Sequence, residues 1–257
     1  MTSGGHIFFF LFATIALSGT PSAFADPPEP IRLAYVEGDI AGMSSIVSED
    51  GKSIIGFVEY RQHRRGSVLE VSRVARFEDG SSDEDRVEAD VGKTLRSIRG
   101  RMIIRNAKGT PTVDVSIDVA AGRIKGFSGL GKKRETYDEA AELTPATYWG
   151  PLLAIVLKNF DENSHGDHLV FQTVVVTPKP RVLNMEFVRK QPVSLERHGS
   201  RIDARLYALS PTINFVVDPI VRMIAPTTSF YVSPGAPPAL ASFRGPRNYD
   251  RQMIRIE

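Results

Sequence analysis

Cysteine is absent from the 257-residue chain, which excludes a disulfide framework and a lipid-modified cysteine anchor. Neither sign of charge is in large excess, since 32 Lys and Arg residues face 30 Asp and Glu residues, for a net charge of +2. A nucleic-acid-binding protein usually carries a concentrated basic face. We therefore expect no nucleic acid among the partners.

Long apolar runs are also lacking, because the run Ile7–Leu17 spans only eleven residues, interrupted by Thr14. A membrane-spanning helix needs about twenty apolar residues. The run is followed by Ala23-Phe24-Ala25, the small-x-small pattern of a signal-peptidase site, although no Lys or Arg precedes Ile7. Residues 1–25 are predicted to be a signal peptide, which leaves an exported protein, periplasmic or extracellular, with no stable membrane span after cleavage.

The rest of the chain is rich in short apolar segments typical of strands. Residues 26–53 are predicted to form a Pro-rich leader and a first strand region, and residues 54–257 a single β-rich domain. Ile54–Gln62 and Val68–Phe77 are predicted to form a hairpin around a His63–Gly66 turn. Thr112–Val119 alternates apolar and polar residues, so one face of that strand is expected to be buried. Further strands are expected at Arg86–Val91, Leu95–Ile98, Met102–Arg105, Arg123–Phe127, Leu169–Val176, Val182–Val188, Ile202–Leu209, Thr228–Val232 and Met253–Ile256.

Two segments favour helices. Pro151–Phe160 begins with proline and is apolar on all sides, so an enclosed helix is expected there. Acidic residues at helical spacing predict a short exposed helix over Glu135–Glu142, and Asp218–Ile224 fits a helical turn or an edge strand. The predicted fold class is mainly β: a curved antiparallel sheet, an open barrel or β-roll, wrapped around one apolar helix.

Motifs that suggest catalysis are incomplete. Gly126–Lys133 approaches the phosphate-binding P-loop, but Lys133 occupies the place of the hydroxyl residue that holds magnesium. Ser128 follows a glycine and a phenylalanine, but Leu130 stands where a nucleophile elbow needs glycine. No catalytic residues and no cofactor are predicted.

Histidine and charged residues give weaker candidates for binding sites. His165 and His168 are of a type that binds zinc, and they are the metal-ligand candidates, although such residues are ordinary in a polar loop. A larger group of basic residues is interpreted either as an anion-binding face or as an ordinary solvated face. Its members are Arg96, Arg99, Arg101, Arg105, Lys132, Lys133 and Arg134.

Aromatic residues flank the predicted barrel and its helix. In an incompletely closed sheet, they would line an apolar cleft for an acyl chain or another hydrophobic ligand. The competing interpretation is that they fill the core. The candidate ligand-binding residues are Tyr60, Phe77, Tyr148, Trp149, Phe160 and Phe171.

Two short motifs carry a family resemblance. The first is Phe77-Glu-Asp-Gly80 at the end of a strand, and the second is Phe243-Arg244-Gly245 before the closing strand Gln252–Glu257. With these motifs the chain resembles a group of uncharacterised bacterial exported proteins, known as a domain of unknown function. That group is similar in architecture to the periplasmic lipoprotein carriers, and the resemblance implies an unclosed β-barrel over a helix without implying catalytic residues.

Three functions remain open. The first is a non-catalytic envelope protein that binds a hydrophobic ligand or a lipidated partner in a cleft between sheet and helix. The second is an envelope hydrolase with converging polar groups at the barrel mouth. The third is a structural or interaction module, which a solid core would favour.

Overall fold

Strands make up most of the described residues, which are 27–35, 37–161, 165–176, 179–197, 200–212, 228–247 and 252–257 of this computed structural model. The first eight strands are β1 (Ile40–Ser48), β2 (Ile54–Arg65), β3 (Val68–Phe77), β4 (Ser82–Asp90), β5 (Arg96–Arg105), β6 (Pro111–Asp118), β7 (Arg123–Ser128) and β8 (Glu135–Ala140). The others are β9 (His168–Val176), β10 (Pro180–Arg189), β11 (Val193–Arg197), β12 (Ser200–Pro211), β13 (Thr228–Ser233), β14 (Ala239–Arg247) and β15 (Gln252–Ile256).

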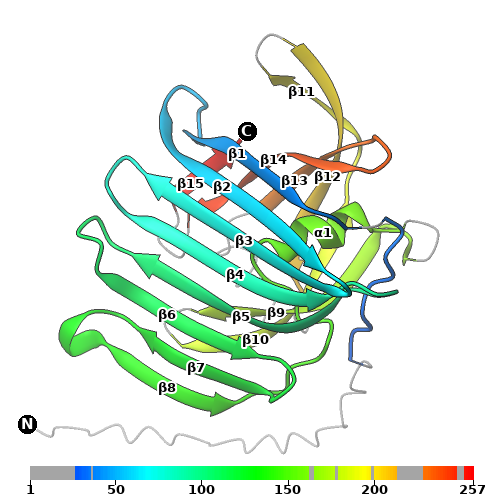
Figure 1. Cartoon of the computed structure of the whole chain (residues 1–257). Helices are drawn as coiled ribbons and strands as arrows, with labels where there is room; N and C mark the ends of the chain where they lie inside the picture. Colours follow the sequence, from blue (N-terminus) through cyan, green and yellow to red (C-terminus); the bar gives the residue numbers. More distant parts are fainter. Residues whose placement is uncertain are drawn as a thin grey trace, which may run out of the picture.

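These strands belong to one antiparallel sheet. Its order is β8-β7-β6-β5-β4-β3-β2-β1-β15-β14-β13-β12-β10-β9, with β11 paired to β12 beside that path. Strands β1 to β8 form a meander of sequence neighbours, and β1 meets β15 where the two halves join, with Ile46 opposite Ile256. The sheet curves around α1, and its end strands β8 and β9 are not paired with each other (Figure 1).

The predicted fold class is confirmed: a curved, unclosed antiparallel sheet surrounds an apolar helix. Helix α1 (Leu152–Lys158) lies within the predicted Pro151–Phe160 segment, with Pro151 as its N-cap. It ends at Lys158 and is capped by Asn159, whose backbone N–H donates to Ile155 O and Val156 O. Four of its seven residues are buried, as expected of a helix inside a sheet.

Two local predictions are wrong. The predicted acidic helix at Glu135–Glu142 is mostly β8, an edge strand that pairs with β7 and buries only Tyr137. An edge strand carries exposed charges as readily as a helix does, so their spacing was not diagnostic. The predicted His63–Gly66 turn is shorter, because β2 continues to Arg65 and the chain reverses at Gly66, whose φ is +65°. The predicted signal peptide and Asp218–Ile224 lie outside the described residues.

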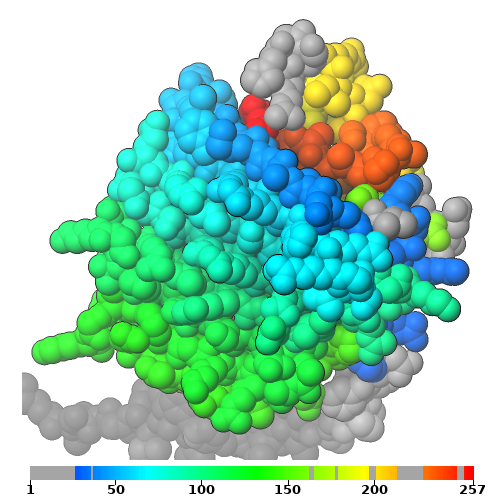
Figure 2. Space-filling view, viewed as in Figure 1, coloured from blue at the N-terminus to red at the C-terminus, as the bar shows by residue number. Residues whose placement is uncertain are grey.

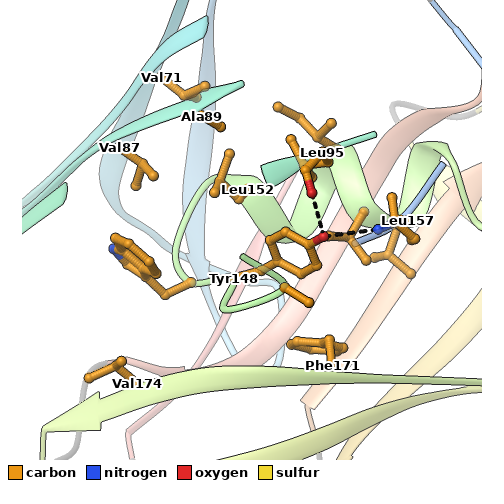
Figure 3. Packing of buried hydrophobic residues seen from close by; sticks show 14 of the residues in the cluster. Val71, Val87, Ala89, Leu95, Tyr148, Leu152, Leu157, Phe171 and Val174 are labelled. Atoms are coloured by element: carbon orange, nitrogen blue, oxygen red, sulfur yellow. Dashed lines mark hydrogen bonds between the residues drawn. The ribbon is translucent and has the colours of Figure 1, made fainter. Parts of the chain in front are cut away.

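Side chains on the inner face of the sheet form the main core around α1. Figure 3 shows Tyr148 and Leu152 between the sheet residues Val87 and Ala89 on one side and Phe171 of β9 on the other. The Tyr148 hydroxyl donates to Leu95 O at 2.7 Å and accepts from the Ile31 N–H at 3.0 Å. Burial raises the pKa of Tyr148 to about 12.

A close approach of backbone and ring fixes Trp149 against β5. A Cβ atom added at Gly100 would lie 2.5 Å from Cζ2 of Trp149 and 2.6 Å from Arg86 O. Glycine at this position therefore lets the indole lie against the strand. Gly100 also explains why the sequence suggested two short strands where the structure has the single strand β5. Among the described residues, no helix has the length and apolar character needed to cross a membrane.

Candidate functional site

The six aromatic candidates occupy the interior and do not form one group. Tyr148, Trp149 and Phe171 are each 1% exposed, and the rings of Tyr148 and Phe171 lie 6.2 Å apart. Phe160 packs edge-on against Tyr207, with 5.4 Å between ring centroids.

The other two aromatic candidates lie elsewhere. Phe77 belongs to a separate cluster with Ile46, Val58, Ala75 and Ile254, and Tyr60 is partly buried at the margin of the main core. Two grooves open on the described surface, one across β2 to β7 and a smaller one along β1 and β2. None of the six aromatic residues lines either of them. Ligand binding by these residues therefore stays a prediction.

A large groove lies on the opposite, outer face of β2 to β7, with a volume of about 860 Å³. We call it the outer groove. Figure 2 shows the face that carries it, formed by the strands coloured cyan to green. Because side chains alternate along a strand, the residues that flank each buried valine or isoleucine on these strands point into the outer groove. Besides His63, its charged residues are Glu59, Arg61, Glu70, Arg86, Glu88, Arg99, Arg101, Asp118, Arg123 and Lys125.

Strand register arranges part of this lining in a straight row across the sheet. Each residue of the row is the direct cross-strand partner of the next. Cations stand on β2, β4, β5 and β7, and small hydroxyl residues stand on β3 and β6. We call this the basic row; it consists of Arg61, Ser72, Arg86, Arg101, Ser116 and Lys125.

Like charges stand directly opposite each other in the outer groove. Arg86 is the partner of Arg101, and in the neighbouring row Glu70 is the partner of Glu88. Directly opposed like charges destabilise an antiparallel sheet. The neighbouring row interleaves the signs elsewhere, since Glu88 faces Arg99 and Asp118 faces Arg123. The direct opposition of Arg86 and Arg101 within the basic row is therefore the unusual feature of this face.

Carboxylates beside the basic row compensate its charge. Glu59 Oε1 lies 2.5 Å from an Arg61 nitrogen and Glu84 Oε1 2.6 Å from Arg86 Nε. Arg101 binds Asp114 through two nitrogens, at 2.8 and 2.7 Å.

These contacts shift the pKa of their partners. The hydrogen bond and charge of Arg61 lower the pKa of Glu59, and the hydrogen bond to Asp114 raises the pKa of Arg101. The side chains of Arg61 and Arg86 are 71% and 74% exposed despite these pairs, so solvent screens the pairs strongly.

The basic face predicted from the sequence is only partly assembled. Arg99 and Arg101 line the outer groove, whereas Arg96 and Arg105 do not. Lys132 and Lys133 lie in the short 3₁₀ helix η1 (Gly131–Lys133), beyond β7. Arg134 stacks over the Phe127 ring at 3.6 Å from its centroid.

The two histidine candidates for a metal site have different neighbours. His168 Nδ1 lies 3.1 Å from Glu186 Oε2 on β10, and the His165 ring stacks on Phe160 at 6.2 Å. Over the ranges that the structure describes, no three His, Asp or Glu residues gather as metal ligands.

A buried polar cluster links the N-terminal segment to the end of α1. Glu37 is 2% exposed, and its carboxylate lies 3.1 Å from Lys158 Nζ and 3.1 Å from Gln62 Nε2. Asn159 Oδ1 accepts from the backbone N–H groups of Ala34 and Tyr35 at 2.9 and 3.2 Å. The buried groups are hydrogen-bonded to one another, so this cluster serves to fasten the segment to the helix.

Sequence reasoning missed Arg61, Arg86 and Lys125 as members of one site. They lie on three strands, and only the register of several successive hairpins brings them into a row. The signal that was available is the alternation of charged and apolar residues along β4 and β6.

No protein-family model and no curated protein matches the chain. Among solved structures, the crystal structure of a β-barrel-like protein of the domain of unknown function DUF1849 from Brucella abortus is similar to it. The two share 11% sequence identity with a TM-score of 0.46, over 88% of this chain and 96% of the other.

Proposed function

We propose that this chain is an exported, non-catalytic binding protein of the cell envelope, which recognises its partner through the outer groove. Export is supported by the signal-peptide pattern of residues 1–25. Binding through the outer face is supported by one observation above all, the direct opposition of Arg86 and Arg101 in the basic row, which acts against the stability of the sheet.

The packed interior also supports binding at the outer groove over a ligand site inside the sheet. Trp149 and Tyr148 are 1% exposed and lie in a continuous core with α1, as expected of an interaction module with a solid interior. A partner at the outer groove needs no rearrangement of that core, because the groove is already open to solvent.

Site-specific photo-crosslinking tests this proposal. A photoreactive amino acid replaces Ser72 or Ser116, the small residues within the basic row, in cells of the source organism. We expect covalent adducts from both positions in the envelope fraction. The control carries the same amino acid at Lys132, which is exposed but lies outside the outer groove. Equal labelling from all three positions, or labelling from none, contradicts the proposal.

A hydrophobic ligand or lipidated partner between sheet and helix is the second candidate, in keeping with the resemblance to lipoprotein carriers. It is supported by the open sheet, whose end strands β8 and β9 are not paired with each other, and by the apolar surface of α1. Such a ligand would have to displace packed side chains around Tyr148 and Phe171.

Trp149 reports directly on this second candidate because it is the sole tryptophan of the chain. Oleic acid is titrated into the purified protein while Trp149 fluorescence is followed, and native mass spectrometry counts bound molecules. A saturable shift with a matching mass increase supports an interior site. An unchanged spectrum leaves the aromatic residues as core and removes this candidate.

A further inference from the structure

We infer that the partner of the outer groove is an acidic polysaccharide that lies across the strands along the basic row. This inference rests on the proposed function, since it names the chemical class of the partner for the same groove. It follows from the spacing of the cations, from the donors that they still have free, and from the polar groups between and beside them.

The spacing of the cations suits a polymer of low charge density. Neighbouring strands lie about 4.8 Å apart, so the six strands from β2 to β7 span roughly 24 Å. Four cations occupy that length, on β2, β4, β5 and β7. One strand of duplex DNA carries a phosphate about every 3.4 Å along the axis and would leave most of its charges unmatched. A polysaccharide with carboxylates on some of its sugars has the sparser pattern.

The arginines keep donors for a second carboxylate. A guanidinium has five N–H donors, and even the two-nitrogen pair of Arg101 with Asp114 leaves others free. Side chains of Arg86 and Lys125 are 74% and 72% exposed, so they can reorient toward a ligand. Exposed ion pairs contribute little to stability, and giving one up for a ligand carboxylate therefore costs little.

The groups around the basic row match the hydroxyls of a sugar. Ser72 and Ser116 place hydroxyls between the cations, and each can donate and accept a hydrogen bond. Carboxylates of Glu70, Glu88 and Asp118 line the same groove and accept from sugar hydroxyls. The same carboxylates repel a uniformly anionic partner, so they select for a chain that alternates charged and neutral polar units.

The lining offers little to a nucleic acid. Proteins that bind single strands stack the bases on aromatic side chains. The described residues that line the outer groove include no Phe, Tyr or Trp. A single-stranded nucleic acid would thus find neither stacking platforms nor a matching charge density.

Direct binding measurements with defined oligosaccharides test the inference. Isothermal titration at low salt compares hyaluronan oligosaccharides, which carry a carboxylate on every second sugar and are long enough to cross six strands, with neutral dextran of equal length. We expect the full mature protein to bind the hyaluronan oligosaccharides and not the dextran, and the affinity to fall as salt is added. No binding of the hyaluronan oligosaccharides overturns the inference.

Variants of matched charge locate the site. R86Q/R101Q removes two cations from the basic row, and K132Q/K133Q removes two exposed cations outside the outer groove. We expect about tenfold weaker binding or more for the first pair and a change within about twofold for the second. The single variant K125Q, with a smaller expected loss, keeps the test valid if the double variant does not fold. Equal losses in the two pairs overturn the inference, because they indicate bulk charge alone.

Other partners give distinguishable results. Tighter binding of an oligodeoxynucleotide or an acidic peptide than of the hyaluronan oligosaccharide contradicts the inference. If Ser72 and Ser116 crosslink to a partner in cells while no hyaluronan oligosaccharide binds, the polysaccharide is wrong and the proposed function stands. If neither position crosslinks, the proposed function itself fails.

Discussion

The two faces of β2 to β7 are built from alternating residues of the same strands but follow different rules. Inside, Val87 and Ile117 are 2% and 1% exposed, and packing against the core determines which residues fit. Outside, Arg86 and Ser116 face solvent, where almost any polar residue is tolerated. An ordered pattern on the tolerant face therefore points to a partner, whereas order on the inner face needs only the fold to explain it.

The largest expected effect on stability comes from removing the Trp149 ring, which packs against the inner face. Trp149→Ala takes away a side chain that is 1% exposed and lies against Gly100. We expect a loss of about 3–5 kcal/mol in the free energy of unfolding, measured by urea denaturation. An effect below about 1 kcal/mol would mean that this part of the interior is not closely packed.

Alkaline pH is expected to lower the free energy of unfolding through the interior, by a smaller amount than Trp149→Ala. Because burial raises the pKa of Tyr148 to about 12, the unfolded chain ionises first, near pH 10. The stabilising contribution is therefore complete below pH 10 and falls between pH 10 and 12, by about 1.4 kcal/mol per pH unit. Urea denaturation at several pH values should show this loss.

Tyr148→Phe serves as the control for the alkaline experiment. It lowers stability at pH 8, because the Leu95 and Ile31 backbone groups lose their partner, but its decline above pH 10 is shallower. Parallel curves for the two proteins would refute the assignment to Tyr148. Burial also raises the pKa of Tyr60, so a slope of the same sign remains in the variant.

Acid pH acts on the outer face instead, because Arg61 lowers the pKa of Glu59. The stabilising contribution of this carboxylate is complete above the usual pKa of glutamate and is lost as the pH falls below that value.

The smallest expected effect is that of Arg86→Gln on stability. The variant loses the pair with Glu84 but relieves the opposition to Arg101, so the free energy of unfolding should change by less than about 0.5 kcal/mol. Its neighbour Val87→Ala, on the inner face of the same strand, should cost about 2 kcal/mol. If Arg86→Gln is the more destabilising of the two, the charges of the outer face serve the fold and their order is no sign of a partner.

Sequence patterns predicted the features of the fold that depend on residues close together in the chain. The alternation in β6 and the apolar surface of α1 are local, and each was assigned to the correct element. Edge strands were harder, because β8 buries Tyr137 alone and its acidic residues fit a helix or a strand equally well.

The basic row was out of reach for a different reason. It depends on the register of five successive strand pairs, and the bulge between Glu88 and Ala89 shifts that register by one residue. An error of one residue in the predicted length of a turn would have placed Arg101 on the opposite face. Turn lengths can be estimated from sequence, but bulges depend on packing that only the folded chain provides.

The pairing of β1 with β15 determines when the sheet can be completed. Ser45 and Glu257 exchange two backbone hydrogen bonds of 3.0 Å, across more than two hundred residues of chain. A ribosome must therefore synthesise more than two hundred further residues before the end of β1 gains its second neighbour, and until then Ile46 and Val47 lie beside an unsatisfied backbone edge. The nascent protein exposes this edge until β15 has been made, so a chaperone that shields residues 45–48 during synthesis would cover a place where strands of two copies could pair.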